Sequence, residues 1–170
     1  MVHKAYLSLG SNLGDRGHYL RDAISRLGEE EGRIVALSSF YETEPVEVTD
    51  QNWFLNCAVQ LETSNAAEQL LSRILKIEHE MGRQRIREKG PRTIDIDILL
   101  FDAVVENTPQ LVIPHPAMAK RRFVLEPLAE IAPEQIHPVL KKTVRELLLE
   151  LPPGQVVRPW FPAAGAPTAE

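Results

Sequence analysis

The residues with the clearest chemical potential form a basic run followed directly by two aspartates. Residues 83–92 carry five basic side chains and one acidic one, in a chain whose net charge is −5. The sequence that follows alternates like a strand, with isoleucines on one face and Asp95 and Asp97 on the other. Side chains two residues apart on a strand share a face, with Cβ atoms roughly 6.5–7 Å apart. The pattern therefore predicts paired carboxylates beside concentrated positive charge.

Paired carboxylates at this spacing suit magnesium that is bound together with phosphate groups. They can flank one cation or bridge two Mg²⁺ ions, which lie ~3.5–4 Å apart in two-metal sites. Mg²⁺ prefers one or two carboxylates plus substrate phosphates, and arginines supply the complementary charge for those phosphates. A charge run alone is more often a solvated surface, and Asp-x-Asp alone fits an exposed edge strand equally well. Together, the two features favour a site for phosphate and Mg²⁺.

The composition indicates one ordinary globular domain that binds something small. The chain has 170 residues, 44% apolar and 25% charged, which is enough to bury a core without metals or disulfides. Its acidic balance argues against bulk binding of nucleic acid or membranes, both of which need a basic face. No apolar run approaches the ~20 residues of a membrane span, and the first residues do not form a signal sequence. The single cysteine, Cys57, fits a reducing compartment, so we expect a cytoplasmic protein.

Hydrophobic periodicity predicts the elements that must position these residues. Strands are predicted at residues 2–9, 34–41, 54–63 and 93–101, and helices at about 19–27 and 70–81. Asn65 and Glu68 resemble a capping box for the second helix, and Gly82 is its natural stop. The order β-α-β-β-α-β predicts an α+β fold with a ferredoxin-like core, in which two helices cover one face of an antiparallel sheet. The other face would remain free for further segments or for ligands.

The rest of the chain gives weaker signals. Residues 42–53 have no clean period and are predicted to form a long exposed loop, a kind of segment that is usually functional or mobile. A last amphipathic helix fits residues 144–151. The proline-rich sequence from Pro152 onward is expected to be irregular. We expect a single domain, residues 1–157, with a C-terminal extension that ends in an irregular or disordered tail, residues 158–170. We also expect a monomer.

Several segments, in order along the chain, resemble one enzyme family. They are LSLGSNLGD, SSFYETEP, FLNCAV, ILKIEHEMGR, GPRTIDIDIL, IPHPAM and RRFVLEPLAEIAP, and they span about residues 4–138. With these segments, the chain resembles the 6-hydroxymethyl-7,8-dihydropterin pyrophosphokinases of folate biosynthesis. The resemblance implies that the β,γ-pyrophosphoryl group of ATP passes to the hydroxymethyl group of the pterin, leaving AMP, with two Mg²⁺ ions as cofactors.

The resemblance also implies a nucleotide half of the site. Asp95 and Asp97 match the metal-binding aspartates, and Arg83 and Arg92 match arginines that touch the phosphates and assist transfer; these four form the implied catalytic set. Further residues match ATP contacts of the family: Glu78, Arg85, Ile98, His115 and Arg121. Attack by an alcohol on a phosphorus atom needs alignment and charge neutralisation more than covalent catalysis, which suits this set.

The pterin half is implied by other segments. A pterin is flat and has an edge of alternating donors and acceptors, so it needs aromatic faces and an amide. Phe54 and Phe123 match the family's stacking pair, and Asn56 matches the amide that reads the edge. The complete implied set is Thr43, Pro45, Val46, Phe54, Asn56, Asp95 and Phe123. Phe54 and Asn56 share one strand face, as a binding site requires.

Simpler interpretations exist for individual residues. Without the resemblance, Phe54 and Phe123 would be core aromatics. Glu78, in the last turn of a helix, would be solvated, and a lone histidine such as His115 is more often a surface or packed residue. The chain also departs from the family pattern at positions that bear on ATP affinity: Leu75, Glu88, Lys89, Gln110 and Val112.

Two other function classes remain open. A metal-dependent phosphohydrolase or nucleotidyltransferase could use the same aspartates, but it leaves Phe54, Asn56 and Phe123 unexplained. A non-catalytic small-molecule sensor could use the same fold, but it leaves the arginines and Asp-x-Asp unexplained. The appearance of AMP from ATP only when a hydroxymethylpterin is present separates these alternatives.

Overall fold

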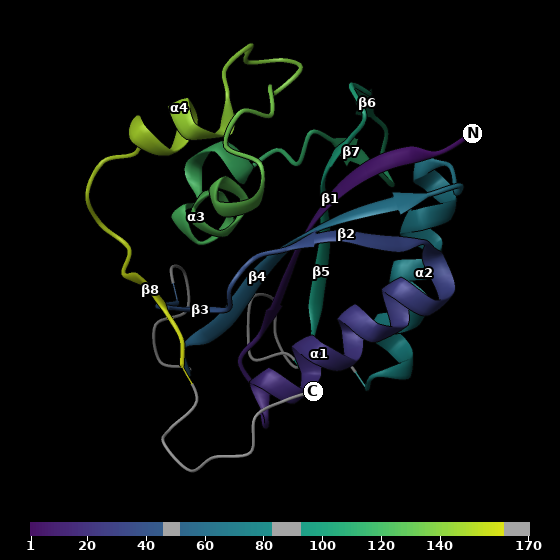
Figure 1. The fold of residues 1–170 in the computed structure, drawn as a ribbon, viewed down its shortest axis with the longest axis horizontal. Coiled ribbons are helices and arrows are strands. Elements are labelled where there is room, and N and C mark those ends of the chain that lie inside the picture. Colours follow the sequence, from purple (N-terminus) through teal and green to yellow (C-terminus); the bar gives the residue numbers. More distant parts are fainter. Residues whose placement is uncertain (46–51, 83–92, 162–170) are drawn as a thin grey trace.

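A six-stranded sheet runs through the middle of the molecule, with helices on both faces (Figure 1). The computed structural model describes residues 1–45, 52–82 and 93–161. The strands are β1 (His3–Ser11), β2 (Arg33–Leu37), β3 (Tyr41–Thr43), β4 (Phe54–Thr63), β5 (Asp95–Phe101) and β8 (Val157–Pro159). Their order is β5-β1-β4-β3-β8, and β2 also pairs with β4. These strands pair antiparallel throughout, so this is a mixed helix and sheet fold built on an antiparallel sheet.

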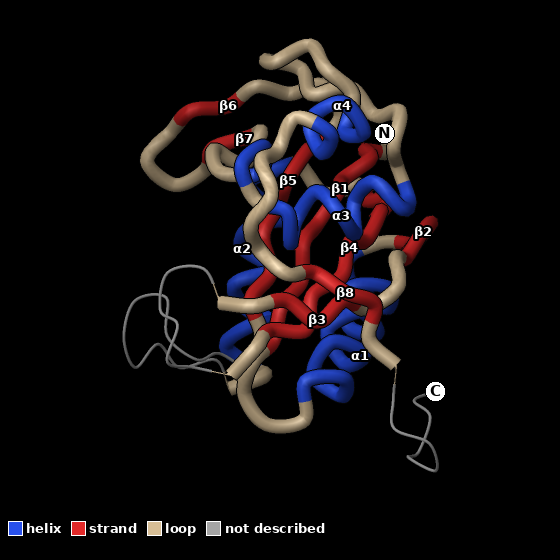
Figure 2. The backbone as a smooth tube through the Cα atoms, turned by 90° about the vertical axis from the view of Figure 1, so that its left-hand side faces the viewer, coloured by secondary structure: helices blue, strands red, loops and turns tan. Residues whose placement is uncertain are grey.

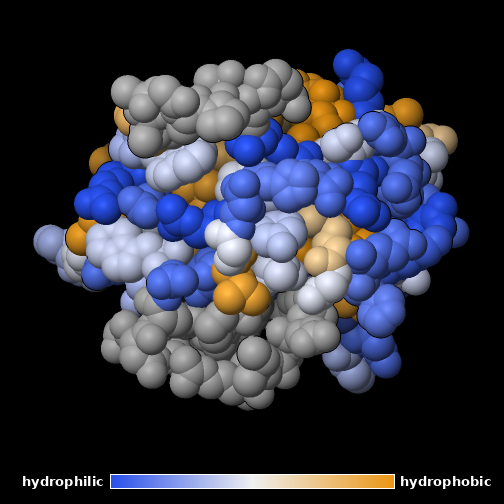
Figure 3. Space-filling view, turned by 90° about the horizontal axis from the view of Figure 1, so that it is seen from below, coloured by the Kyte–Doolittle hydropathy of each residue, from blue (hydrophilic) through white to orange (hydrophobic). Residues whose placement is uncertain are grey.

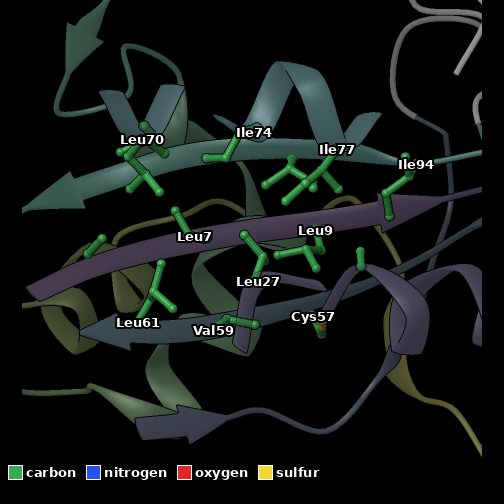
Figure 4. Close-up of a cluster of buried hydrophobic side chains, with 14 of the residues drawn as sticks. Leu7, Leu9, Leu27, Cys57, Val59, Leu61, Leu70, Ile74, Ile77 and Ile94 are labelled. Atoms are coloured by element: carbon green, nitrogen blue, oxygen red, sulfur yellow. The ribbon is translucent and has the colours of Figure 1, made fainter. Parts of the chain in front are cut away.

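The first face of the sheet is covered by α1 (Arg16–Arg26) and α2 (Ala67–Glu80). Alternation on β1 and β4 places Leu7, Leu9 and Val59 on this face, where they meet Ile74 and Ile77 of α2 (Figure 4). All five side chains are buried. This contiguous apolar cluster supplies most of the driving force that holds the two helices against the sheet.

The second face carries α3 (Arg122–Ile131) and α4 (Val144–Leu149) over part of its length. Tyr6, Ala58 and Leu100 of the sheet pack beneath these helices in a second apolar cluster. A register shift between β1 and β5 lets Ile98 stay on the first face while Leu100 faces the second. Farther along the strands, past this cluster, the second face becomes polar, and the candidate site lies there.

The outer surface agrees with this layering. Seen from below, the described residues are mainly hydrophilic with small apolar patches (Figure 3). Amphipathic helices that bury one stripe leave such a surface. No helix in the described ranges is long and apolar enough to cross a membrane.

The predicted strands and helices are found, with shifts at their ends. The 54–63 prediction is confirmed, whereas 34–41 divides into β2 and β3. The N-cap of α2 is Ala66, one residue after the expected Asn65: Ala66 N–H donates to Gln69 Oε1, and the Asn65 side chain donates to Glu31 Oε1 instead. Gly82 follows the last turn with φ 78°, as its prediction as a stop requires. Two short strands, β6 (Glu106–Asn107) and β7 (Val112–Ile113), form a hairpin after β5.

The C-terminal extension differs from the expectation. It was expected to be irregular from Pro152, with the domain ending at residue 157, but β8 crosses that boundary and pairs with β3. Trp160 beyond it stacks on Phe40 with ring centroids 6.3 Å apart. The segment is therefore part of the folded domain as far as it is described. Residues 162–170 lie outside the described part of the chain.

Candidate functional site

A row of paired residues crosses three strands at the polar end of the second face. Gly10 of β1 pairs with Asn56 of β4 on one side and with Asp95 of β5 on the other. Residues directly opposite each other in an antiparallel pair share a face. Strands lie ≈4.7–4.9 Å apart, so the backbones of Asn56 and Asp95 are separated by about 10 Å. The amide and the carboxylate of the predicted site therefore face the same space across a glycine.

The two aspartates lie as their alternation predicts. Asp95 and Asp97 are partly exposed on β5, whereas Ile94 and Ile96 are buried against the first face. Within the described residues, no group of three or more His, Cys, Asp or Glu side chains forms a potential metal cage. Two carboxylates without a full cage fit Mg²⁺, which takes its remaining ligands from substrate phosphates and water. This donor set suits a metal that is bound together with a nucleotide.

Glu78 is buried rather than solvated, and it stabilises the strand that carries the aspartates. Its side chain is 5% exposed, and its Oε2 accepts a hydrogen bond from the Ile96 N–H at 2.8 Å. Because β5 ends the described sheet, this N–H would otherwise be an unpaired edge group. The bond fixes the backbone midway between Asp95 and Asp97. The predicted role of Glu78 in ATP binding stays a prediction, and the structure gives it a positioning contact.

Ile98 does not present its side chain to the polar face. It belongs to the cluster under α1 and α2 and is 6% exposed. A contact between this side chain and ATP, as the resemblance could suggest, is therefore not compatible with its packing. A nucleotide could reach only its backbone.

His115 lies near Asp95 and Arg121, two residues of the predicted nucleotide site. Its backbone N–H donates to Leu99 O, and its Nδ1 accepts from the Ala117 N–H at 3.1 Å. Burial, followed by the charge of Arg121, lowers the pKa of His115, while Asp95 acts in the opposite direction. The imidazole is therefore neutral at pH 7 with its proton on Nε2, since Nδ1 is used as an acceptor. A neutral imidazole that donates from Nε2 can hydrogen-bond a phosphate oxygen.

Asn56 is held in a tight polar contact at the pterin end. It is 4% exposed, and its Nδ2 donates to Thr43 Oγ1 at 2.6 Å. The space above Gly10 is filled by this amide: a Cβ built on Gly10 would lie 2.5 Å from Asn56 Oδ1 and 3.5 Å from Phe54 Cδ1. Gly10 is not among the predicted site residues. A glycine inside a strand marks a close approach of another group to the backbone, and this is the signal that could have found it.

The aromatic residues come from two different elements. Phe54 begins β4 beside Asn56, and Phe123 lies in the first turn of α3. The guanidinium carbon of Arg121 lies 5.5 Å from the centre of the Phe123 ring. Both phenylalanines are only partly buried, unlike the core aromatic Phe101. Pro45, two residues after Thr43, is buried.

Four predicted residues lie outside the described part of the chain: Val46, Arg83, Arg85 and Arg92. The described members nevertheless include both ends of the predicted site. Thr43, Phe54, Asn56 and Asp95 share one face of the sheet, and α3 brings Phe123 to it from above.

Comparisons with known proteins show the family of the chain. The family model of 7,8-dihydro-6-hydroxymethylpterin-pyrophosphokinase (HPPK) matches residues 6–133. A 2-amino-4-hydroxy-6-hydroxymethyldihydropteridine pyrophosphokinase of Methylorubrum extorquens is 45% identical over 156 residues, 91% of this chain and 98% of the relative. The protein of the same name from Bacillus subtilis is 49% identical over 132 residues, 77% of this chain and 79% of the relative.

Solved structures show the same fold. A Plasmodium falciparum HPPK-DHPS chain superposes with a TM-score of 0.70 at 21% identity, covering 88% of this chain and 43% of that longer chain. Together with the relatives, the sheet and its polar face define a transferase, an enzyme that transfers diphosphate. The chain belongs to the HPPK family, whose members act in folate biosynthesis.

Proposed function

We propose that this enzyme transfers the β,γ-pyrophosphoryl group of Mg-ATP to the hydroxymethyl group of 6-hydroxymethyl-7,8-dihydropterin. The products are AMP and the pterin diphosphate. The observation that carries the proposal is the row Asn56–Gly10–Asp95, in which the amide proposed to read the pterin and the carboxylate proposed to bind metal lie on one face of the sheet. Their separation of about 10 Å, from the spacing of strands, leaves room for the acceptor alcohol and the phosphates between them.

The reaction needs alignment more than covalent help. The hydroxyl oxygen of the pterin bonds to the β-phosphorus, the bond from that phosphorus to the oxygen bridging to the α-phosphorus breaks, and the hydroxyl proton is released. Two Mg²⁺ ions, held by Asp95 and Asp97 and by the ATP phosphates, would neutralise the charge that develops. Arg83 and Arg92 would hold the phosphates in line. His115 lies close enough to both Asp95 and Arg121 to feel their charges, which supports His115 Nε2–H and Arg121 as further phosphate contacts.

The pterin half would orient the acceptor. Asn56, fixed by Thr43, reads the donor and acceptor edge of the ring, and backbone groups near Pro45 and Val46 complete that edge. Phe54 and Phe123 stack on the two faces of the ring. Burial of the Asn56 amide makes the recognition selective. A ring that cannot hydrogen-bond this amide leaves a desolvated polar group without a partner, which costs binding free energy.

The finer structural assignments support the same proposal. The order β5-β1-β4, with β2 on the far side of β4, fits the predicted ferredoxin-like core. The lone cysteine, Cys57, is buried and free, which suits the predicted cytoplasmic location. We also propose that the enzyme acts as a monomer.

The test is the identity of the nucleotide product. The protein is incubated with Mg-ATP alone, with 6-hydroxymethyl-7,8-dihydropterin, and with 6-methyl-7,8-dihydropterin, which lacks the acceptor hydroxyl. We expect AMP in equal amount to pterin diphosphate in the second mixture and no nucleotide turnover in the other two. Nucleotide cleavage in all three mixtures would favour a phosphohydrolase or nucleotidyltransferase, and pterin binding without turnover would favour a sensor.

A further inference from the structure

We propose that Gln155, in the segment leading into β8, is a positioning residue that links the two walls of the pterin pocket. The inference rests on the proposed function, because it concerns the same pocket. The Gln155 Nε2 donates to the carbonyl oxygen of Glu44 at 2.7 Å, and its Oε1 accepts from the backbone N–H of Phe123 at 3.3 Å. One side-chain amide therefore bridges the strand that carries Thr43 and the helix that carries Phe123.

One end of this bridge bonds to the backbone of Phe123, a proposed pterin contact, and the other bonds to the backbone of Glu44, the neighbour of Thr43 and Pro45. Phe123 is in the first turn of α3, where backbone N–H groups have no partner within the helix. Its N-cap residue, Arg121, makes no side-chain capping bond, so the Gln155 oxygen serves as a cap supplied from a distant segment. Glu44 lies between Thr43 and Pro45. The same amide therefore fixes both the start of α3 and the end of β3.

The segment that holds Gln155 is itself firmly attached to the sheet. Glu44 N–H donates to Val156 O at 3.2 Å, and Val156 N–H donates to Glu44 Oε1 at 2.7 Å. β8 then continues alongside β3, as the tube view shows (Figure 2). Because Val156 and β8 are hydrogen-bonded to Glu44 and β3, the backbone next to Gln155 is held in place, and its side chain can hold Phe123.

A second contact anchors β8 on the opposite face. Arg158 Nη2 donates to Glu42 Oε1 at 2.9 Å, and Arg16 Nη2 donates to Glu42 Oε2 at 3.0 Å. Burial opposes ionisation of Glu42, but the hydrogen bonds and charges of Arg158 and Arg16 outweigh it and lower the pKa of this carboxyl. Glu42 is therefore ionised at neutral pH, and the two arginines join β8, β3 and the start of α1.

The consequence concerns the width of the slot that receives the pterin ring. Phe54 and Thr43 come from paired strands, so their spacing is set by the sheet. The spacing of Phe123 from them depends on how α3 is seated. At its far end α3 is held by Glu130, which accepts from Tyr41 Oη at 2.5 Å and from Ser39 N–H at 3.1 Å. Gln155 holds the near end, where Phe123 lies.

The test compares Gln155→Ala and Gln155→Glu with the matched control Gln135→Ala. Gln135 Nε2 donates to the carbonyl oxygen of the neighbouring Ile136 at 3.3 Å, and the residue is half-buried. Gln155→Glu keeps an oxygen for Phe123 N–H but loses the donor to Glu44 O. With net values of ≈0.5–1.5 kcal/mol for a hydrogen bond and 1.4 kcal/mol for each factor of ten, we expect KM for the pterin to rise about three- to tenfold in both Gln155 variants.

The split between kinetic constants separates positioning from general loosening. KM for ATP, and kcat at saturating pterin, should stay within about twofold of the parent, because the Asp95 end of the site is untouched. The thermal midpoint is measured for each variant, and kinetics are taken well below it. An unchanged KM for the pterin in Gln155→Ala, or an equal rise for ATP and pterin, overturns the inference alone. A parent protein that does not bind the pterin overturns the proposed function and this inference together.

Discussion

The two faces of the central sheet use the same strands for opposite purposes. On β1, Leu7 and Leu9 point into a continuous apolar layer under α1 and α2, whereas Ser8 and Gly10 point to the second face. That second face is apolar only where α3 and α4 cover it. Its other end carries Gly10 together with the amide and carboxylates of the candidate site.

The contrast between the two faces of the sheet shows how one sequence can specify both a fold and a site. Alternation with a period of two separates the tasks residue by residue. Side chains on the first face are selected for volume and apolarity, and those at the polar end of the second face for charge and hydrogen bonding. The comparison therefore predicts that substitutions on the first face change stability, whereas those at the polar end change function.

The largest expected effect is the loss of turnover in Asp97→Asn. This change keeps the shape of the side chain but removes the negative charge that the proposed Mg²⁺ ions require. Metal-ion charge stabilisation is worth several kcal/mol, so we expect kcat to fall by about a thousandfold or more. The thermal midpoint should move by no more than a few degrees, because Asp97 is partly exposed. Product formation under saturating Mg²⁺ and ATP is the measurement.

A matched control for this variant is Asp22→Asn. Asp22 accepts a hydrogen bond from Arg26 Nε at 3.3 Å on α1, outside the proposed site. An i,i+4 helix pair of this kind is worth about 0.3–0.5 kcal/mol, so both activity and stability should remain close to those of the parent. Parent-like turnover in Asp97→Asn would show that the carboxylate does not anchor the metal.

On the first face, Leu7→Ala should have the reverse profile. Leu7 is fully buried, and buried Leu→Ala changes cost about 2.7–5.0 kcal/mol of unfolding free energy. The kcat of the folded fraction, measured at low temperature, should remain within about threefold. Urea unfolding of this variant is compared with Leu75→Ala, whose side chain is 53% exposed on α2. That control should change stability by less than about 0.5 kcal/mol. If Leu7→Ala abolished turnover in folded protein, the proposal that the first face serves stability and the polar end serves function would be wrong.

The first face was the more predictable one. The strand at 54–63 and the helix stripe Leu70, Ile74 and Ile77 follow from periodicity alone, because a packing face needs only size and apolarity. Asp95 and Asp97 also followed from alternation. The family resemblance, rather than any pattern, grouped Phe123 with Phe54 and Asn56, because Phe123 lies on α3 whereas the other two share β4.

The remaining features depend on tertiary contacts that a sequence pattern does not encode. Glu78 looked like a solvated residue of a last helical turn, yet its carboxylate covers the edge of β5. The tail looked irregular because of its prolines, yet Pro159 ends an edge strand, a position that tolerates a missing N–H. Gln155 gave no signal at all, since its partners lie 111 and 32 residues away along the chain.

Gly10→Ala tests whether the polar end depends on the absence of a side chain. The new methyl group would lie 2.5 Å from Asn56 Oδ1, a contact that forces the amide to move. We expect pterin affinity to fall by about ten- to a hundredfold, because a displaced amide loses its hydrogen bonds to the ring. Affinity for an ATP analogue should change by less than threefold. Gly154→Ala is the matched control, since a Cβ there meets nothing within 4 Å; calorimetric titration of both variants is the measurement.

Asn56→Ala removes the amide at the polar end without adding bulk. A buried polar group of the ring left without its partner costs roughly 1–3 kcal/mol, so pterin should bind at least about tenfold more weakly, with ATP-analogue binding nearly unchanged. Phe123→Ala should also weaken pterin binding. It should lower the affinity for other bicyclic rings to a similar extent, because stacking tolerates many flat ligands and so discriminates less between them.

Combining Asn56→Ala with Gly10→Ala makes this comparison sharper. Once the amide is gone, the nearest neighbour of the methyl group on residue 10 is Phe54 Cδ1 at 3.5 Å, an ordinary contact. The second substitution should therefore add little to the first, in both stability and pterin affinity, which is the coupling expected of two groups that share one space. Additive losses would mean that Gly10 serves the strand backbone rather than the amide. Parent-like pterin binding in Asn56→Ala would mean that Asn56 is a structural strand residue and that the pterin pocket lies elsewhere.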